Sequence, residues 1–280
     1  MVTRADYPEE TTEACRGVLV ELISLLGRNS EYMVLVGGWV PYFQFKDHGG
    51  GHVGSLDVDL SLDFRNIPND DYSTFLERLG ERGYEQDERN PASFWRTVTL
   101  KDGREVRIKV DFVAGEYGGR GRKHRHQIAQ DLRARKARGC DIVFENSFTV
   151  DVEGRLPDGG LRSERVNVAG VVPFLVMKGM ALHDRLKEKD AYDVCFVVRN
   201  YPGGTQALAF AFGPFAGNSL VMEGLSKIRA QCPSVDHFVP VAFVTFELIE
   251  DEEEREIEQR DAFERVSAFL DLLEIKPFSG

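Results

Sequence analysis

The chain has 280 residues, of which 42% are hydrophobic and 10% aromatic, and this composition excludes an intrinsically disordered protein. Its net charge of −11, from 35 basic and 46 acidic residues, excludes a generally basic nucleic-acid-binding protein but allows a local basic patch. No apolar run approaches the roughly 18 residues of a membrane span, and residues 1–10 lack the apolar segment of a signal peptide. We therefore expect a folded, cytoplasmic protein without a membrane segment.

The first half of the chain mixes predicted helices and strands. Apolar side chains at helical spacing predict helices over residues 11–26 and 70–83. Asp102-Gly103 is typical of a hairpin turn and lies between two of the predicted strands. The predicted strands are residues 32–36, 56–64, 94–100, 105–113, 141–144 and the edge strand 148–152. Residues 1–168 are therefore expected to form an α/β (α+β) domain with a mixed sheet.

The second half of the chain predicts helices. Helical spacing is clear over residues 173–187 and 190–199, weaker over 217–231, and clear again over 260–273. Residues 238–248 fit a strand and a buried helix equally well, because a short apolar run has no distinguishing period. Residues 169–280 are therefore expected to form a mostly helical C-terminal domain.

Acidic residues alternate with apolar ones in the predicted strand 56–64. Side chains two apart on a strand share a face, so Asp57 and Asp59 present two carboxylates together, with Asp63 further along. Adjacent like charges favour a counter-ion, and a hard divalent cation such as Mg²⁺ takes oxygen ligands. A third acid, Asp111, lies on the predicted strand 105–113 and would converge with the pair if the two strands are neighbours. The alternative for the first strand alone is a solvated polar face.

A pair of glycines, Gly37-Gly38, closes the apolar strand 32–36 and precedes a predicted helical segment at 39–45. This arrangement allows backbone N–H groups and a helix N-terminus to approach phosphate oxygens. The same turn also occurs as a simple connection between a strand and a helix, without phosphate binding. It indicates phosphate binding only in combination with the carboxylates.

Three segments in order, LVGGW at 35–39, LDVDL at 56–60 and KVDFV at 109–113, resemble the hG[G/S]…DhDh…hDh pattern of the DNA polymerase β nucleotidyltransferase superfamily. A second block over residues 178–194 resembles the K…R…[K/R]DxxD segment of its AbiEii/AbiGii toxin-type branch. The resemblance implies Mg²⁺-dependent transfer of a nucleotidyl group from an NTP, with Mn²⁺ as the alternative metal. Asp57 and Asp59 would be metal ligands, and Asp111 a third ligand or the base.

The resemblance also implies a set of nucleotide-binding residues. Lys178 would contact the nucleotide phosphates as a catalytic residue, and Arg185, seven positions later, is expected on the same helix face. Asp190 and Asp193 would orient that lysine or the acceptor, and the alternative is a solvated helix surface with local ion pairs. The expected nucleotide-binding residues are Gly37, Gly38, Ser55, Lys178, Arg185, Asp190 and Asp193.

Two features depart from the pattern of the family. Trp39 stands where many members carry Ser or Thr, and the segment between Gly38 and Asp57 is longer than usual. Ser55 is expected to supply the missing hydroxyl. We interpret His48 and His52, which lie in this segment, as residues of a flexible loop rather than metal ligands.

A basic segment over residues 120–138 contains eight Lys or Arg residues and the single acid Asp131. We expect it to bind the phosphates of RNA, such as a tRNA end, which the toxin-type resemblance implies as acceptor, together with an antitoxin protein as partner. A basic surface without a partner is the alternative reading. Two other function hypotheses are a small-molecule (antibiotic) nucleotidyltransferase and a non-catalytic nucleotide-binding protein that uses the acidic helix 250–273 to bind a partner.

Overall fold

The chain forms two compact units in the computed structural model. One unit comprises residues 7–40 and 54–170, and the other joins residues 1–6, 41–53 and 171–280. No helix in the described part of the chain is long and apolar enough to span a membrane. The structure describes residues 1–46, 51–63, 66, 72–116, 126–129 and 132–278.

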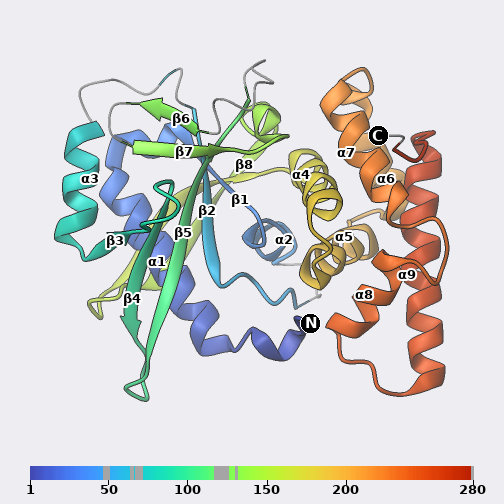
Figure 1. Cartoon of the computed structure of the whole chain (residues 1–280), viewed down its shortest axis with the longest axis horizontal. Helices are drawn as coiled ribbons and strands as arrows, with labels where there is room; N and C mark the ends of the chain where they lie inside the picture. The colour runs from blue at the N-terminus through green and yellow to red at the C-terminus, as the bar shows by residue number, and fades with distance from the viewer. Residues whose placement is uncertain (47–50, 64–65, 67–71, 117–125, 130–131, 279–280) are drawn as a thin grey trace. The chain divides into compact units, whose positions relative to one another are not determined.

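All the described strands belong to one mixed sheet in the first unit (Figure 1). Its order is β3-β4-β5-β2-β1-β9-β8, and β7 pairs with both β5 and β6. β2 with β5, β1 with β9 and β5 with β7 run parallel, and the other pairs are antiparallel. The strands are β1 (Met33–Val36), β2 (Asp57–Leu62), β3 (Tyr84–Gln86), β4 (Ser93–Thr99), β5 (Glu105–Ala114), β6 (His126–Ala129), β7 (Leu132–Lys136), β8 (Ser147–Arg155) and β9 (Leu161–Ala169). The predicted mixed α/β fold is confirmed.

The alternating pattern of β2 determines which of its side chains enter the core. Val58 and Leu60 are fully buried on one face, whereas Asp57 and Asp59 are half-buried on the other. β2 lies between β1 and β5, so the two acids stand in the interior of the sheet rather than at an edge. The predicted β4–β5 hairpin is confirmed, and it places β4 beside β5, on the side of β5 opposite β2.

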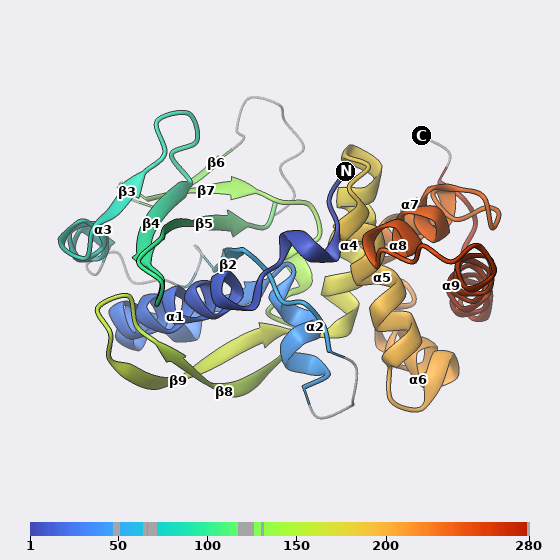
Figure 2. The same cartoon turned by 90° about the horizontal axis from the view of Figure 1, so that it is seen from below.

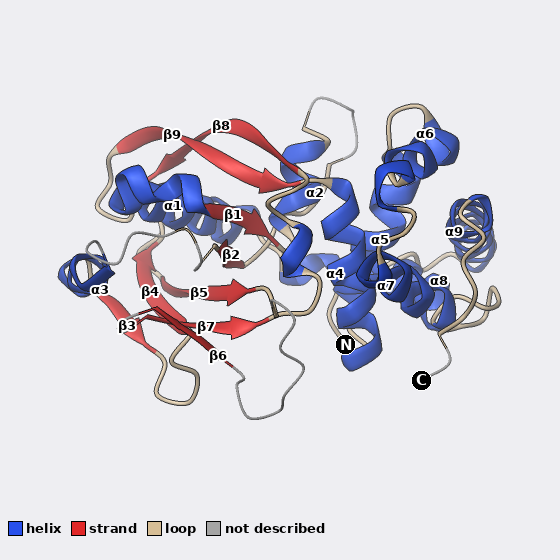
Figure 3. Ribbon diagram, turned by 90° about the horizontal axis from the view of Figure 1, so that it is seen from above, coloured by secondary structure: helices blue, strands red, loops and turns tan. Residues whose placement is uncertain are grey.

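The long helix α1 (Glu9–Leu26) packs against the sheet. It contacts β8 and β9 as well as β2 and β5, and Figures 2 and 3 show β8 and β9 on one side of it and β4 and β5 on the other. The helix buries Val18, Leu19 and Leu22 completely. It begins two residues before the predicted start and ends, as predicted, before Gly27, and α3 (Tyr72–Glu81) also belongs to this unit.

The second unit contains helices and no strand among its described residues (Figure 3). Its core includes Tyr192, whose ring stacks on that of Phe246 at 4.4 Å between centroids. A Cβ at Gly179 would lie 1.9 Å from the carbonyl oxygen of Gly224, so glycine permits the close contact of α4 with α7. Its helices are α4 (Val171–Asp184), α5 (Glu188–Asn200), α6 (Gly204–Ala211), α7 (Ser219–Ala230), α8 (Phe238–Phe246) and α9 (Glu252–Leu272), and α2 (Trp39–Gln44) spans the boundary with the first unit.

Several local predictions were wrong or incomplete. Residues 141–144 form no strand: the first two belong to a short 3-10 helix at Cys140–Ile142, the next two lie in the turn after it, and the apolar Ile142 and Val143 are buried there. The ambiguous segment 238–248 is the helix α8, with Pro240 in its first turn, where a missing N–H costs nothing. The acidic run belongs to α9, because acidic side chains are favourable in a first turn and Asp251 accepts a hydrogen bond from the Glu254 N–H.

Four of the described strands, β3, β6, β7 and β9, were not predicted from the sequence. β9 carries five polar or charged side chains among nine residues, because much of it pairs with the edge strand β8 and faces solvent. A strand of this kind has no apolar run from which a prediction could start.

Candidate active site

Three acidic residues share one face of the sheet across the pair β2–β5, and we call Asp57, Asp59 and Asp111 the carboxylate patch. Asp59 is the direct register partner of Asp111, and Asp57 is the partner of Lys109. Neighbouring strands are about 4.8 Å apart, and residues two apart on a strand share a face. The expected convergence of the third acid with the first two is therefore confirmed by the strand pairing.

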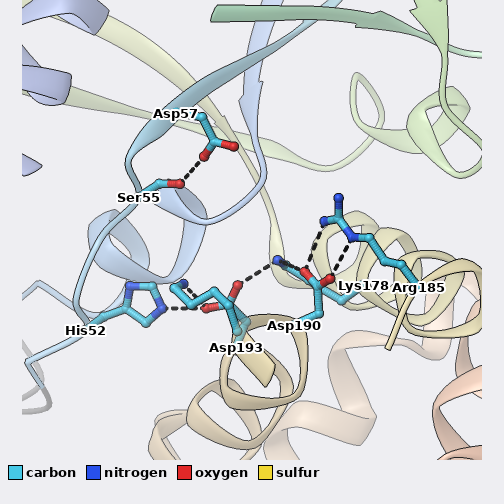
Figure 4. A network of polar contacts seen from close by, with 8 residues as sticks. His52, Ser55, Asp57, Lys178, Arg185, Asp190 and Asp193 are labelled. Carbon is cyan, nitrogen blue, oxygen red and sulfur yellow. Dashed lines mark hydrogen bonds and ion pairs between the residues drawn. The ribbon is translucent and has the colours of Figure 1, made fainter. Parts of the chain in front are cut away.

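The side chain and backbone of Asp57 are both held by neighbours. The Ser55 hydroxyl donates a short hydrogen bond to Asp57 Oδ1 (Figure 4), and the indole Nε1 of Trp39 donates to the Asp57 carbonyl oxygen at 3.0 Å. Trp39 is almost completely buried. The residue that departs from the family pattern therefore serves to anchor the strand that carries the acids, and the hydroxyl at Ser55 lies beside the first carboxylate.

Both oxygens of Asp111 also have partners. The Ser93 hydroxyl on β4 donates a short hydrogen bond to Asp111 Oδ1, and Lys109 Nζ lies 2.8 Å from Asp111 Oδ2. The Asp111 side chain is 13% exposed and that of Lys109 is 32% exposed. A hydroxyl from one neighbouring strand and an ammonium from the same strand thus fix the orientation of the third carboxylate.

The glycine turn approaches the patch from β1. Gly37 has a φ of +75°, and a Cβ at this position would lie 2.3 Å from Asp59 Oδ2. The position therefore needs glycine both for its backbone conformation and for the space that the carboxylate takes. Gly38 follows in the turn that leads into α2 and is buried. Asp63 lies beyond the end of β2, where it accepts a hydrogen bond from Asn66.

The donor set of the carboxylate patch fits a hard divalent cation such as Mg²⁺, because carboxylate oxygens are the ligands that such ions prefer. Asp57 and Asp59 supply two carboxylates on one strand, and the missing side chain at Gly37 leaves room beside Asp59. Asp111 fits in type and position, but both its oxygens have protein partners. Across the described residues, no group of three or more His, Cys, Asp or Glu side chains stands assembled for a metal ion.

A second set of charged residues lies in the helical unit, where α4 meets α5, and we call Lys178, Lys189, Asp190 and Asp193 the lysine cluster. Lys178 Nζ lies 2.7 Å from Asp190 Oδ1 and 2.6 Å from Asp193 Oδ2 (Figure 4). Lys189 Nζ also contacts Asp193. All four residues are buried, so the alternative of a solvated helix surface is wrong for this segment.

Arg185 joins the lysine cluster from its rim. It follows the last assigned residue of α4, although its backbone N–H still donates to the Ala181 carbonyl oxygen as in a helical turn. Its Nε lies 3.0 Å from Asp190 Oδ2, while 60% of its side chain is exposed. Asp190 therefore contacts both basic side chains that the family resemblance singled out.

Burial and charge act in opposite directions on the lysine cluster. Burial disfavours the Lys178 ammonium, but the charges of Asp190 and Asp193 outweigh burial and raise the pKa of Lys178 above its usual value. Burial likewise disfavours the Asp193 carboxylate, yet Lys178 and Lys189 hold its pKa well below the ordinary range. Burial, together with the charge of Lys178, outweighs the attraction of Asp193 and lowers the pKa of Lys189. Lys178 and Asp193 thus remain charged at neutral pH.

His52 is a buried part of this cluster rather than a flexible loop residue, which corrects the sequence interpretation. Its Nε2 lies 2.8 Å from Asp193 Oδ1, and its ring stacks on Tyr192 and meets Phe196 edge-on. Burial and the charge of Lys189 lower the pKa of His52 to about 4, so the ring is neutral at pH 7. Because Asp193 is ionised, Nε2 must carry the proton that it donates. His48 lies outside the described residues.

The basic segment is described only in part. Arg135 on β7 is exposed, and its register partner is Val113 on β5, two residues after Asp111. Arg135 therefore shares the sheet face of the carboxylate patch. Arg138 Nη1 contacts Glu116 at 2.7 Å. The basic residues Arg120, Arg122, Lys123 and Arg125 lie outside the described residues.

Three residues of these sites were not predicted from the sequence: Ser93, Lys109 and His52. Lys109 could have been predicted, because it lies two residues before Asp111 on the same strand and therefore shares its face. Ser93 reaches Asp111 only through the pairing of β4 with β5 in one particular register. His52 is 141 residues from Asp193 in the chain, and no local pattern connects them.

The family model described as nucleotidyl transferase AbiEii toxin, of type IV toxin–antitoxin systems, matches residues 31–275, which include the carboxylate patch and the lysine cluster. The chain belongs to this family. It is accordingly a nucleotidyltransferase, as the resemblance of its three strand motifs and of the block at 178–194 implies, and the family places it in a toxin–antitoxin context.

Two solved structures from Helicobacter pylori are similar to the chain. One is of a proposed nucleotidyltransferase, at 15% identity and a TM-score of 0.40, and covers 92% of this chain and 96% of that one. The other is JHP933, at 14% identity and a TM-score of 0.37, with 92% and 94% covered. No match to a curated protein is found.

Proposed function

We propose that this nucleotidyltransferase moves an NMP from an NTP to a hydroxyl group of RNA, such as a tRNA end, in a Mg²⁺-dependent reaction. One observation carries the metal-dependent chemistry: the parallel register of β2 and β5 sets Asp59 directly beside Asp111, with Asp57 on the same face. A protein that used this sheet only as a scaffold would have no need for three carboxylates at adjacent interior positions, since like charges repel.

The carboxylates have distinct roles in the proposed reaction. The acceptor hydroxyl oxygen attacks the α-phosphorus, its proton passes to Asp111, and the bond to the β-phosphate oxygen breaks to release pyrophosphate. Ser93 and Lys109 hold Asp111 in one orientation, so its remaining lone pairs face a fixed direction. Asp57 and Asp59 would hold the metal ion, and the charge of a bound ion would neutralise the triphosphate and the leaving pyrophosphate.

Lys178 would bind a phosphate of the nucleotide. Its ammonium is fixed by Asp190 and Asp193 and stays protonated, and a fixed cation suits a phosphate oxygen because little reorganisation is needed on binding. Arg185 has an exposed side chain that is anchored on Asp190, and it would provide a second cation. Gly37, Gly38 and Ser55 would bind nucleotide phosphates from the sheet unit.

RNA is the acceptor that we favour because of the basic segment. Arg135 projects from the carboxylate face of the sheet, close to the end of β5, and is exposed. A polyanionic acceptor would gain from such a cation, with an affinity that falls as salt is raised. The family context adds an antitoxin protein as a further expected partner, and we expect the chain to act in the cytoplasm.

Calorimetric titration with non-hydrolysable ATP, GTP, CTP and UTP analogues, with and without Mg²⁺, tests the nucleotide site. The double variant Asp57→Ala with Asp59→Ala should lose metal-dependent binding. Asp151→Ala with Glu153→Ala is a matched control, because these two acids have the same spacing on the exposed face of β8 and should not matter. Equal binding by both double variants would contradict the assignment of the site.

Transfer of label from α-³²P-NTPs to total RNA, compared with transfer to aminoglycosides, tests the acceptor. RNA labelling that weakens in high salt and in Arg135→Gln supports the proposal. Labelling of the small molecules alone would replace RNA as acceptor and leave the nucleotide site in place.

A further inference from the structure

Lys109 shares the sheet face of the carboxylate patch. It pairs with Asp57 across β2–β5 and precedes Asp111 by two residues, so residues 57, 59, 109 and 111 occupy four adjacent positions of the sheet. Three of these positions are acids and the fourth is a lysine, which leaves a net charge of −2. The proposed reaction gives this ammonium no part beyond orienting Asp111.

The contact of Lys109 with Asp111 is well placed to compete with a metal ion. Lys109 Nζ lies 2.8 Å from Asp111 Oδ2, while the Ser93 hydroxyl donates to the other oxygen. An ammonium is a compact positive charge that can neutralise a carboxylate. One carboxylate lone pair cannot accept a hydrogen bond from the ammonium and bind a metal ion at the same time. A divalent ion that uses Asp111 Oδ2 as a ligand therefore has to displace Lys109.

We propose that Lys109 is a resident cation of the carboxylate patch that competes with the divalent metal ion for Asp111. The inference rests on the metal site in the proposed function and deepens it. In the chain without nucleotide, Asp57 and Asp59 would provide the first ligands of the ion, and Asp111, the base of the proposed reaction, would become a third ligand only when the Lys109 ammonium leaves its Oδ2. Lys109 is thus a positioning residue that lowers metal affinity in the absence of nucleotide.

Binding of Mn²⁺ without nucleotide, followed by electron paramagnetic resonance of the free ion, measures this competition. Lys109→Met should bind Mn²⁺ roughly tenfold more tightly than the wild-type chain, because Asp111 Oδ2 is then no longer paired with an ammonium and is open to the ion. Lys109→Arg keeps the charge and should retain the wild-type affinity. Lys101→Met is the matched control, since Lys101 is an exposed lysine at the β4–β5 turn, eight residues before Lys109. Thermal unfolding of each variant verifies that it is folded.

The same titration with Asp111→Asn shows whether Lys109 acts through Asp111. In that background Lys109→Met should give no further gain in Mn²⁺ affinity. The proposal is overturned if Lys109→Met and the wild-type chain bind Mn²⁺ equally, if neither binds it, or if the gain persists with Asp111→Asn. Nucleotide transfer together with equal Mn²⁺ affinities would overturn the role of Lys109 alone. The expected affinities without any nucleotide transfer would overturn the proposed function alone.

Discussion

The carboxylate patch and the lysine cluster collect charge in opposite ways. In the patch, three acids share a face of the sheet with a single lysine, and Asp57 and Asp59 are half-buried. In the lysine cluster, two lysines and two aspartates are buried, and each contacts a residue of opposite charge. The patch therefore keeps unbalanced charge that favours a cation, whereas the cluster is close to neutral by itself.

This difference predicts that the two regions contribute differently to stability and to activity. Removing one charge from a buried, balanced cluster leaves its partners without compensation in a poorly solvated place. Removing one acid from a patch of like charges relieves repulsion. The lysine cluster should thus be needed for folding, while the carboxylate patch should be needed mainly for chemistry.

The largest expected effect is that of Asp193→Asn. It leaves the Lys178 and Lys189 ammonium groups short of a buried counter-charge, and we expect a loss of about 3–5 kcal/mol in the free energy of unfolding. Asp59→Asn in the patch should leave the stability unchanged or raise it. Urea unfolding at pH 7 measures both, with Asp184→Asn at the exposed end of α4 as the control. Equal losses for Asp193→Asn and Asp59→Asn would break the comparison.

The next effect is a pH dependence of stability that originates at His52. Its pKa is about 4 in the folded chain and near 6.5 when unfolded, so the unfolded chain binds the proton more readily and stability falls as the pH drops from 6.5 to 4. The loss reaches about 3 kcal/mol at pH 4 for this fully buried group. The charged groups that face it are Asp193, Lys189 and Lys178, and its ring stacks on Tyr192.

Urea unfolding between pH 7.5 and pH 4.5 measures this dependence in wild type and in His52→Gln. Glutamine can still donate to Asp193 but does not titrate, so its stability should fall less steeply over that range. His237→Gln is the control, because it removes a half-buried histidine of the same unit whose Nδ1 contacts the Gln231 carbonyl oxygen, and it should follow the wild-type curve. Parallel curves for His52→Gln and wild type would show that His52 is not the titrating group.

A smaller effect is expected for Gly37→Ala, and it concerns activity. The added Cβ would displace the Asp59 carboxylate, and misplacement of a reacting group by about 1 Å can cost on the order of 10²-fold in rate. Gly103→Ala is a matched control, because Gly103 has a φ of +86° but an added Cβ meets nothing within 4 Å. Steady-state rates of NTP turnover should fall in the first variant and persist in the second. Equal rates would mean that glycine at position 37 is needed only for the backbone conformation of the turn and not for the placement of Asp59.

Much of the fold was readable from the sequence, for reasons that differ between segments. Strong periodicity placed α1, β2 and the β4–β5 hairpin, because alternation and helical spacing reflect burial directly. The segments that were not predicted correctly have weak or ambiguous patterns of apolar residues. Residues 238–248 have no period that separates a buried helix from a strand, and the edge-paired β9 is mostly polar.

The candidate site divides in the same way. The sequence indicated all three acids of the patch, since Asp57 and Asp59 share a strand and Asp111 lies in a similar apolar setting. It also indicated Lys178, Asp190 and Asp193, through the resemblance of the block at 178–194 to the K…R…[K/R]DxxD segment of the family. It could not indicate the serine on β4 that holds Asp111, because the choice of neighbouring strand and register is not a local property.

The sequence by itself thus determined which residue types the protein has for its chemistry and on which local elements they lie, because spacing along a strand or helix follows from backbone geometry. Only the tertiary structure decided which of them meet. The parallel pairing of β2 with β5 places Asp59 beside Asp111, and burial brings His52, expected in a flexible loop, against Asp193, which also pairs with Lys178. Such contacts join residues far apart in the chain, and they form where burial of apolar surface and pairing of charges are satisfied together.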